Sequence, residues 1–514
     1  MPDDAKTTTE SRRSAKERKR VQTEVERKYD VEAGAELPEL VGAGPAAAED
    51  REEPVTLRAE YFDTADRALS RGRITLRRRE GGADEGWHVK LPGSAGRTEI
   101  HAPLTTTSTV PAAVRRPVLG YVGREPLEPL ALLETVRGIT RISDADGRQL
   151  AEVADDLVIA RDARTGEERR WREWEVELVD AHGDEGEAVL DAIEERLLAA
   201  GARPAESASK LARATGGPID DSVPAPTDGG EAALAAIREL LRDLRAIDPR
   251  VRLQADDALH RMRVLTRRLR TVLAGSRSVL DRAVTDPIRD ELRWLAGVLG
   301  SARDEEVLAE RLHAAFASAG EGVPRGLSVG SRIFDEGEQR HAAALIRVDR
   351  ALHGRRYLGL LSSLDALLAD PPRTGGAESS AKKLVRRSLA KELARVEEAR
   401  GAESEDAVAA RHEIRKAAKR LRYLVQAWSS VVPDAVRPRH RALESAAKQV
   451  ADALGEERDA IAMREVVLAS AVAAAERGES AFVLGIVFAD EGNRAQEATA
   501  ASDAALSRLH SLSR

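Results

Sequence analysis

The stretch Val21-Gln-Thr-Glu-Val-Glu-Arg-Lys-Tyr29 places charged residues at alternate positions, with Glu24, Glu26 and Lys28 separated by single residues. Successive side chains of a β-strand point to opposite faces, so these three would lie together on one face of a sheet. A solvated face rarely carries both signs of charge in this way on several strands of one domain, so a repeated arrangement calls for an explanation. This chain repeats the arrangement.

Three later segments also alternate charged and apolar side chains, and the period of two predicts β-strands. Their charged faces consist of Arg77 and Arg79 in 74–79, His88 and Lys90 in 87–91, and Glu173, Glu175 and Glu177 in 173–178. Because Arg77, Arg78 and Arg79 are consecutive, a shift of one residue in the strand would exchange the inward and outward side chains.

A closed antiparallel β-barrel with a polar interior and helices outside is the simplest fold that accommodates several charged strand faces. Its acidic strands would hold a divalent cation, and its basic strands would hold the oxygens of a polyanion. Carboxylate, phosphate and water oxygens suit Mg²⁺ or Mn²⁺. The alternative is an antiparallel sheet with one solvated face and ordinary cross-strand ion pairs.

Composition limits the class of protein. With 514 residues and 42% hydrophobic content, the chain can form two or three domains with ordinary cores. The absence of cysteine excludes disulfides and thiolate metal sites, and it fits the cytoplasm most simply. The net charge of -7 means that a polyanion would have to bind to local basic clusters.

The sequence indicates neither a membrane-spanning segment nor a signal peptide. The longest apolar run without a charge, 466–475, is well short of the roughly 20 residues that span a bilayer. Residues 1–20 are rich in Lys and Arg and have no apolar segment, which predicts a disordered basic tail rather than a signal peptide.

The chain changes character after residue 215. Residues 216–230 are rich in Gly, Pro and Asp and predict a linker, and residues 231–514 show Ala, Leu and Arg at helical spacing. We therefore expect an α+β protein with a β-barrel domain at 21–215 and an all-α domain at 231–514.

The helical half contains an internal repeat. Residues 259–270 (Leu-His-Arg-Met-Arg-Val-Leu-Thr-Arg-Arg-Leu-Arg) recur 152 residues later at 411–422 (Arg-His-Glu-Ile-Arg-Lys-Ala-Ala-Lys-Arg-Leu-Arg). A Leu-Gly-x-x-Arg-Asp element follows each copy, at 299–304 and at 454–459, which are 155 residues apart. The repeat predicts two pseudo-symmetric four-helix bundles, at about 231–370 and 382–514, joined by the Pro- and Gly-containing segment 370–376.

Each copy carries a basic stripe, because its charged residues recur at steps of three and four along one helix face. The stripes are His260, Arg263, Arg267 and Arg270 in the first copy and His412, Arg415, Lys419 and Arg422 in the second. Like charges at this spacing repel by about 0.2–0.5 kcal/mol per pair, so a polyanion that neutralises both stripes is one explanation. The other is a solvated face opposite Asp and Glu of adjacent helices.

The N-terminal pattern resembles the CYTH family, the triphosphate tunnel metalloenzymes, whose signature is Glu-x-Glu-x-Lys. The resemblance covers about residues 21–215 and implies that Lys28, Arg77, Arg79, Lys90, Arg141 and Lys210 bind phosphate oxygens. It also implies that Glu24, Glu26, Asp155, Glu175 and Glu177 hold a metal ion or position water, with Glu24, Glu26 and Lys28 at the catalytic centre. Asp155 is followed by Asp156, and alternation alone leaves open which of the two points inward.

The paired His-x-x-Arg helices and the Leu-Gly-x-x-Arg-Asp elements resemble the CHAD family, the conserved histidine α-helical domain. This resemblance covers about residues 230–512 and implies that both stripes bind inorganic polyphosphate along a basic groove. Arg303 and Arg458 are weaker candidates, since each has a neighbouring Asp. The two histidines could instead be hydrogen-bonded structural residues.

The two resemblances together imply a metal-dependent inorganic triphosphatase whose helical domain binds polyphosphate or targets the enzyme to polyphosphate granules, and from the composition we expect it in the cytoplasm. A barrel that binds triphosphate without turnover and a barrel that cyclises nucleotides are the alternatives. Nucleic acid is the least favoured partner, because stacking aromatics are scarce in the helical half. The preferred metal, the substrate length and the oligomeric state stay open.

Overall fold

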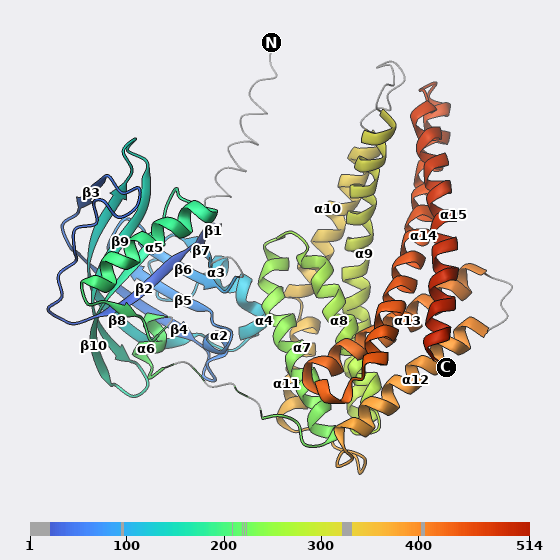
Figure 1. Cartoon of the computed structure of the whole chain (residues 1–514), viewed down its shortest axis with the longest axis horizontal. Coiled ribbons are helices and arrows are strands. Elements are labelled where there is room, and N and C mark those ends of the chain that lie inside the picture. Colours follow the sequence, from blue (N-terminus) through green and yellow to red (C-terminus); the bar gives the residue numbers. More distant parts are fainter. Residues whose placement is uncertain are drawn as a thin grey trace. The chain divides into compact units, whose positions relative to one another are not determined.

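The computed structural model describes residues 21–93, 97–207, 209–217, 219, 222, 224–320, 332–401 and 407–513, which form two compact units divided after Ser222 (Figure 1). The predicted basic tail at 1–20 lies outside the described residues. No helix in the described ranges combines the length and the apolar character that a membrane crossing requires.

The N-terminal unit is built on one antiparallel sheet (Figure 1). All four segments with alternating charge form strands in it. The hydrogen-bonded order is β1-β7-β6-β5-β4-β8-β9-β10-β2-β11, with β3 paired to β8. The strands are β1 (Val21–Glu24), β2 (Glu26–Val31), β3 (Ala48–Arg51), β4 (Val55–Asp63), β5 (Thr75–Glu80), β6 (Gly86–Leu91), β7 (Arg97–Ala102), β8 (Glu128–Ser143), β9 (Gln149–Asp162), β10 (Glu168–Leu178) and β11 (Arg203–Pro204).

The predicted closed barrel is wrong, because the hydrogen-bonded path is open, with β1 at one end and β11 at the other. β1 and β2 follow one another along the chain and are separated only by Val25, so they lie end to end rather than side by side. The chain changes partner at that residue: β1 pairs with β7, and β2 pairs with β10. This stretch therefore supplies the strand at one end of the path and the strand next to the other end, and no ladder between described residues closes the sheet.

Helix α5 (Gly183–Ala199) covers the apolar face of β2 and β10 (Figure 1). Its sequence has apolar residues at helical spacing, and these pack on the apolar residues that alternate with charge in the strands. The packed side chains include Tyr29, Trp174, Val176, Val189, Ile193 and Leu197. Burial of this face forces the alternating charged residues onto the opposite face of the same strands.

That opposite face is apolar in one region. There the short helix α6 (Lys210–Ala214) contributes Leu211 and Ala214 to a cluster with Tyr61, Leu133 and Trp171. The side chain of Ser209 accepts a hydrogen bond from the Ala212 amide and caps this helix. The cap and the two buried residues fix Lys210, at the first helical position, against the charged strands. Short helices α2 (Ala68–Arg71), α3 (Ala112–Arg115) and α4 (Leu119–Val122) and a 3₁₀ turn (Arg116–Val118) lie in the connections.

The C-terminal unit is all-α, as its composition predicts. Before the joint at 370–376 lie α7 (Gly229–Arg252), α8 (Ala258–Gly275), α9 (Arg282–Gly320), α10 (Arg332–His353) and α11 (Arg355–Ala369). After it lie α12 (Ala381–Gly401), α13 (Ala407–Val431), a 3₁₀ turn (Pro433–Ala435), α14 (Pro438–Glu476) and α15 (Phe482–Ser513).

The two halves of this unit share one apolar core, which includes Leu240, Leu273, Leu361, Trp428 and Leu509. Among the described residues, the first half has five helices because the chain breaks between α10 and α11 at Gly354. Buried side chains of both repeats pack in this cluster, and the division into two four-helix bundles stays a prediction.

Candidate functional site

Cross-strand register brings opposite charges together on the charged face of the sheet. The directly opposed pairs are Lys28 and Glu175, Arg137 and Asp156, Lys90 and Glu99, and Arg141 and Glu152. Residues opposed in an antiparallel pair have Cβ atoms about 4.5–5.5 Å apart, so their side chains interact. The charged face is thus a continuous network of cations and carboxylates.

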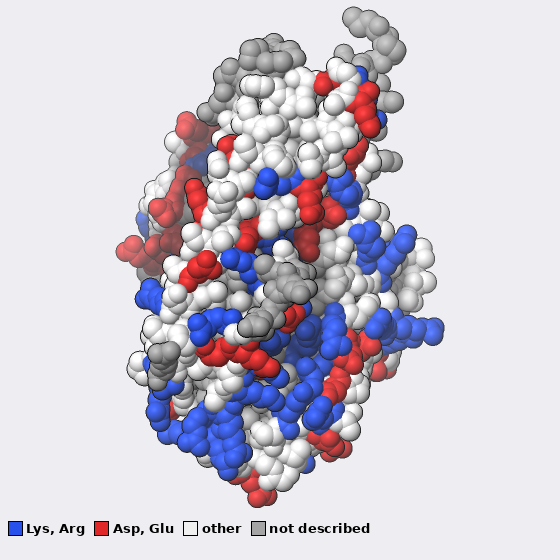
Figure 2. Space-filling model, turned by 90° about the vertical axis from the view of Figure 1, so that its right-hand side faces the viewer, with Lys and Arg blue, Asp and Glu red and all other residues white. Residues whose placement is uncertain are grey.

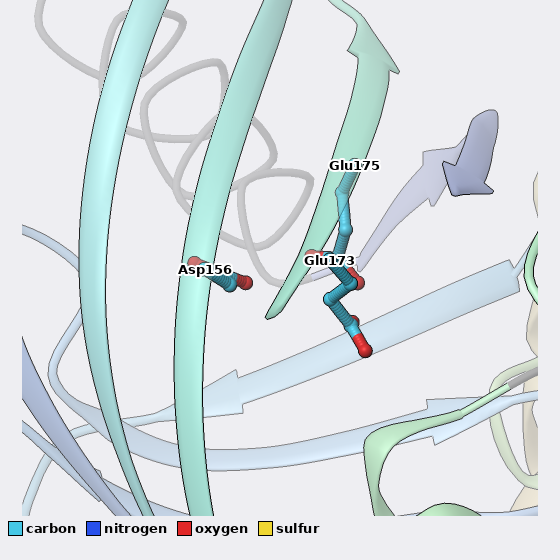
Figure 3. A group of neighbouring side chains, drawn as sticks. All are labelled: Asp156, Glu173 and Glu175. Atoms are coloured by element: carbon cyan, nitrogen blue, oxygen red, sulfur yellow. The ribbon is translucent and has the colours of Figure 1, made fainter. Parts of the chain in front are cut away.

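Asp156, Glu173 and Glu175 form an acidic group (Figure 3), and the ammonium group of Lys210 contacts all three. In that figure Asp156 reaches from β9 toward the two glutamates of β10. The Lys210 Nζ atom is 2.9 Å from Asp156 Oδ2, 2.6 Å from Glu173 Oε1 and 2.7 Å from Glu175 Oε1. Burial lowers the pKa of Lys210, but the three carboxylates outweigh it and hold that pKa above its usual value.

Arg137 joins the same group, although the sequence did not single it out. Its Nε and Nη2 atoms donate to the two oxygens of Asp156 at 2.7 and 2.5 Å, and Nη2 also donates to Glu175 at 2.9 Å. Arg141, the predicted ligand four residues later, has a side chain 42% exposed that pairs with Glu52 and Glu152. Arg137 shares the alternation of Arg141, and that was the signal that could have found it.

Arg77 and Arg79 lie on the charged face with their Nε atoms buried and without a hydrogen-bond partner. Arg77 donates to the hydroxyl of Tyr61 at 3.4 Å, and Arg79 pairs with Asp84. Burial, together with the charges of Arg77 and Arg137, lowers the pKa of Arg79 to about 9. These guanidinium groups repel one another in a buried place, which favours an anion between them.

Lys28 contacts Glu175 and lies 3.1 Å from Glu26 Oε2. Burial raises the pKa of Glu177. The charge of Lys90 lowers that pKa, and the carboxylates of Glu26, Glu175 and Glu99 raise it further. Mutual repulsion of carboxylates is the electrostatic condition that a divalent cation relieves. Glu24 lies in β1, and its side chain is outside the described part of the structure.

Asp155 and Asp156 point to opposite faces of β9. Asp155 pairs with Arg172, whose Nε and Nη2 atoms donate to its carboxylate at 2.8 and 2.6 Å. Asp156 is fully buried among Arg137, Lys210 and Glu175. The register therefore separates Asp155 from the other predicted metal ligands and puts Asp156 in its place.

His88 and Lys90 both reach Glu99 of β7. The Nδ1 atom of His88 is 2.7 Å from Glu99 Oε1, and Lys90 Nζ is 3.6 Å from Glu99 Oε2. Burial lowers the pKa of His88 to about 4, against the opposing effect of Glu99, so the imidazole is neutral near pH 7. His88 thus supports the wall of the site rather than adding charge to it.

The carboxylate oxygens of this face could bind a metal ion. Ligand atoms of Asp156, Glu173 and Glu175 lie within 4.8 Å of one another, and hard oxygen donors suit Mg²⁺ or Mn²⁺. The ammonium group of Lys210 already contacts all three. The carboxylates around Glu177, where acidic repulsion persists, fit a divalent ion better.

In the helical unit both basic stripes meet in one groove of about 520 Å³. Eleven of its lining residues are Lys or Arg, and among the described lining residues none is Asp or Glu. The cations are Arg267, Arg270, Arg277, Arg289, Arg293, Arg395, Arg415, Lys416, Lys419, Arg420 and Arg458. We call this cavity the basic groove. Figure 2 shows Lys and Arg gathered in the lower half of one face of the molecule.

Four cations of the basic groove, Arg267, Arg270, Arg415 and Lys419, have no ion pair within the described ranges. Burial and the nearby Arg415, Arg267 and Arg263 lower the pKa of Lys419 to about 7. Burial, with Arg458, lowers the pKa of Arg415 to about 10. This repulsion between the two stripes is unfavourable in the free protein, and a bound polyanion would relieve it.

The remaining predicted stripe residues lie at the margins of the basic groove. His412 lines it, whereas His260, Arg263 and Arg422 are not among its lining residues. Arg263 pairs with Asp304 at 3.1 Å, and Arg422 lies 5.9 Å from the ring centre of Tyr423. Burial and nearby cations lower the pKa of both histidines, so neither contributes positive charge near pH 7. Arg303 pairs with Glu306 at 2.8 Å, and Arg458 lines the groove while pairing with Asp304 and Asp459.

Comparisons with known proteins assign the two parts of the chain to different families. Residues 22–214 match the family model described as the CYTH domain, and residues 235–508 match that described as the CHAD domain. An uncharacterized protein of Mycobacterium tuberculosis is 36% identical over 505 residues, which cover 95% of this chain and 96% of that protein.

Two shorter similarities accompany these matches. The thiamine-triphosphatase of Macaca fascicularis is 37% identical over 131 residues, which cover 23% of this chain and 52% of that enzyme. The crystal structure of the CHAD domain from the plant Ricinus communis is 23% identical, with a TM-score of 0.43, and covers 56% of this chain and 94% of that structure.

Proposed function

This chain belongs to the CYTH and CHAD domain families, as its motifs predict, and from that membership we propose that its N-terminal unit hydrolyses inorganic triphosphate or a related short polyphosphate. The similarity to a thiamine-triphosphatase supports a triphosphate substrate. The observation that carries the proposal is the convergence of buried cations and carboxylates on one face of the sheet.

The cations are suited to a chain of phosphoryl groups. Arg77 and Arg79 have buried Nε donors without partners, and Lys28, Lys90, Arg137 and Lys210 lie on the same face. Phosphoryl transfer needs neutralisation of charge and in-line positioning more than covalent help. Guanidinium groups bind phosphate oxygens in a bidentate manner, which fixes the orientation of the substrate.

Glu26, Glu175 and Glu177, together with Glu24, would hold the Mg²⁺ or Mn²⁺ ion. When bound, such an ion supplies charge neutralisation and lowers the pKa of a water molecule. Burial raises the pKa of Glu177 in the metal-free protein, and a bound cation would stabilise its carboxylate. Asp156 and Glu173 instead hold Lys210 and Arg137 in place.

Phosphate release from triphosphate, longer polyphosphate, ATP and thiamine triphosphate tests the reaction, with Mg²⁺, Mn²⁺ or a chelator present. We expect release from triphosphate only with a metal ion, and we expect Glu26→Ala and Glu177→Ala to lower it by at least about a hundredfold. Glu168→Ala, which removes an exposed glutamate, is the matched control. Metal-dependent release of cyclic AMP from ATP would instead favour a cyclase, and tight binding without turnover would favour a binding protein.

For the helical unit we propose binding of inorganic polyphosphate along the basic groove. The eleven lining cations and the four among them without ion pairs support this role. A bound chain would raise the local concentration of substrate or dock the protein on polyphosphate granules in the cytoplasm.

Calorimetric titration of the full chain with long polyphosphate tests this binding. Changing Arg267, Arg270, Arg415 and Lys419 together to Gln should weaken binding by at least about a hundredfold and reduce its dependence on salt. The matched control changes four exposed arginines outside the groove, Arg261, Arg386, Arg387 and Arg439, to Gln. Equal losses in both variants would contradict a specific role for the groove.

A further inference from the structure

The basic groove is not charged evenly along its length. Its lining residues include Arg277, which follows the end of α8, and Arg289 and Arg293, which lie in α9. The offsets of the internal repeat place Ser429 at the position of Arg277 and Glu444 at the position of Arg289. The duplication has therefore produced a groove whose two ends differ chemically.

The second copy does not build an equivalent cluster. The Oε1 atom of Glu444 accepts a hydrogen bond from Gln426 at 2.7 Å, and Gln426 stands at the repeat position of Ala274. Arg441 and Lys448 are the counterparts of Asp286 and Arg293, but both are exposed and neither lines the groove. Within the described lining residues, α14 contributes a single cation, Arg458.

The first end carries more positive charge than its carboxylates neutralise. Arg277 Nη2 and Arg289 Nη1 lie 2.7 and 2.6 Å from the same oxygen of Asp286. Arg395 and Arg420 likewise share the buried carboxylate of Glu392.

Spare hydrogen-bond donors accompany this surplus charge. The Nε atoms of Arg277 and Arg289 are buried and have no hydrogen-bond partner. Burial, followed by the charges of Arg293, Arg267, Arg289 and Arg420, lowers the pKa of Arg270. We call the set Arg270, Arg277, Arg289, Arg293, Arg395 and Arg420 the arginine end.

The terminal group of a phosphate chain differs from the groups inside it. A terminal phosphoryl group has three oxygens outside the bridge and carries about -1.5 to -2 charges near pH 7, because its second pKa is about 6. An internal phosphoryl group has two such oxygens and one negative charge. Converging guanidinium groups with spare donors match the terminal group better.

Building on the proposed binding of polyphosphate, we propose that the arginine end holds the terminal phosphoryl group of the chain. The rest of the chain then lies between the two basic stripes and leaves the groove on the side of Ser429 and Glu444, which stand at the repeat positions of Arg277 and Arg289. Linear polyphosphate therefore binds with one of its two identical ends inside the groove.

Calorimetry on the full chain compares short linear polyphosphate with a cyclic phosphate of the same number of phosphoryl groups, which has no terminal group. The test variant is Arg277→Gln with Arg289→Gln, and Arg277→Gln alone serves as a milder change. Arg439→Gln with Arg508→Gln is the matched control, since both arginines are exposed and neither lines the groove. Circular dichroism verifies that each variant keeps its helix content.

We expect the double variant to lose about tenfold in affinity for the linear chain and less than about twofold for the cyclic one. The control should change both affinities by less than about twofold. Equal losses for linear and cyclic ligands in the double variant would overturn the end assignment while leaving polyphosphate binding intact. A wild-type protein that binds neither ligand would overturn the proposed function and this inference with it.

Discussion

Replacing Lys210 by methionine removes the ammonium group that contacts three carboxylates at once. The side chains of Lys210, Asp156, Glu173 and Glu175 are only 10%, 0%, 6% and 11% exposed. Removal of one partner from a buried ion pair costs about 3–5 kcal/mol, because the remaining charge is left without compensation. Arg137 still pairs with Asp156 and Glu175 in the variant, so we expect a loss near the lower limit, about 3 kcal/mol.

Hydrogen exchange followed by mass spectrometry measures this loss in the full chain. Amides of β9 and β10 should exchange roughly a hundredfold faster in Lys210→Met, while amides of α7 to α15 should be unchanged. Arg203→Met is the matched control, because it removes an exposed cation of the same unit.

The pH dependence follows from the carboxylates. Burial raises the pKa of Asp156 and of Glu175, and Lys210 and Arg137 more than offset it, so both pKa values are lowered in the folded protein. A lowered carboxyl pKa contributes stability above the unfolded value, about 4, and that stability is lost as the pH falls through the folded value. The difference between wild type and Lys210→Met should therefore be largest at neutral pH and shrink in acid. An unchanged exchange rate at pH 7 would refute the reasoning.

Three further outcomes test other parts of the structure. Mg²⁺ should slow exchange of β9 and β10 amides more in Lys210→Met than in wild type, because the ion can take the place of the ammonium group among Asp156, Glu173 and Glu175; equal protection would contradict this. Arg137→Gln should raise the KM for triphosphate by at least about tenfold, whereas Arg141→Gln should change it by less than about twofold in steady-state assays, since only Arg137 contacts the buried acidic group. Polyphosphate binding should take up a proton above pH 7 and weaken as the pH rises further, because the pKa of Lys419 is lowered to about 7 in the free protein and an anion raises it. Titrations in buffers of different ionisation enthalpy measure that uptake, and Lys419→Arg should abolish it.

Local patterns in the sequence determined the elements and the kinds of residue at the sites. Alternation in 173–178 predicted that Glu173, Glu175 and Glu177 share a face, because strand geometry fixes that face without reference to any other part of the chain. Likewise, steps of three and four placed each basic stripe on one side of a helix, and the repeat showed that the stripes form a pair.

Only the tertiary structure decided which of the neighbouring candidates enter the site. Asp155 and Asp156 are equivalent in sequence, but the pairing of β9 with β10 buries Asp156 beside Lys210 and turns Asp155 toward Arg172. Whether Arg137 or Arg141 enters the site depends in the same way on where each residue lies along β8 relative to β9 and β10. These strands are distant in sequence, and no local pattern encodes their contacts.

The closure of the sheet and the asymmetry of the basic groove are also properties of the assembled chain. The alternating charges predicted a closed barrel, but closure depends on a ladder between the two ends of the sheet, and the hydrogen-bonded path runs open from β1 to β11. The internal repeat predicted two pseudo-symmetric four-helix bundles, but side-chain packing decides which residues line the groove, so that Arg277 and Arg289 line it and Glu444 does not. The sequence determines local periodicity because the direction of each side chain follows from the backbone of its own segment. Burial and charge pairing arise only when distant segments pack together.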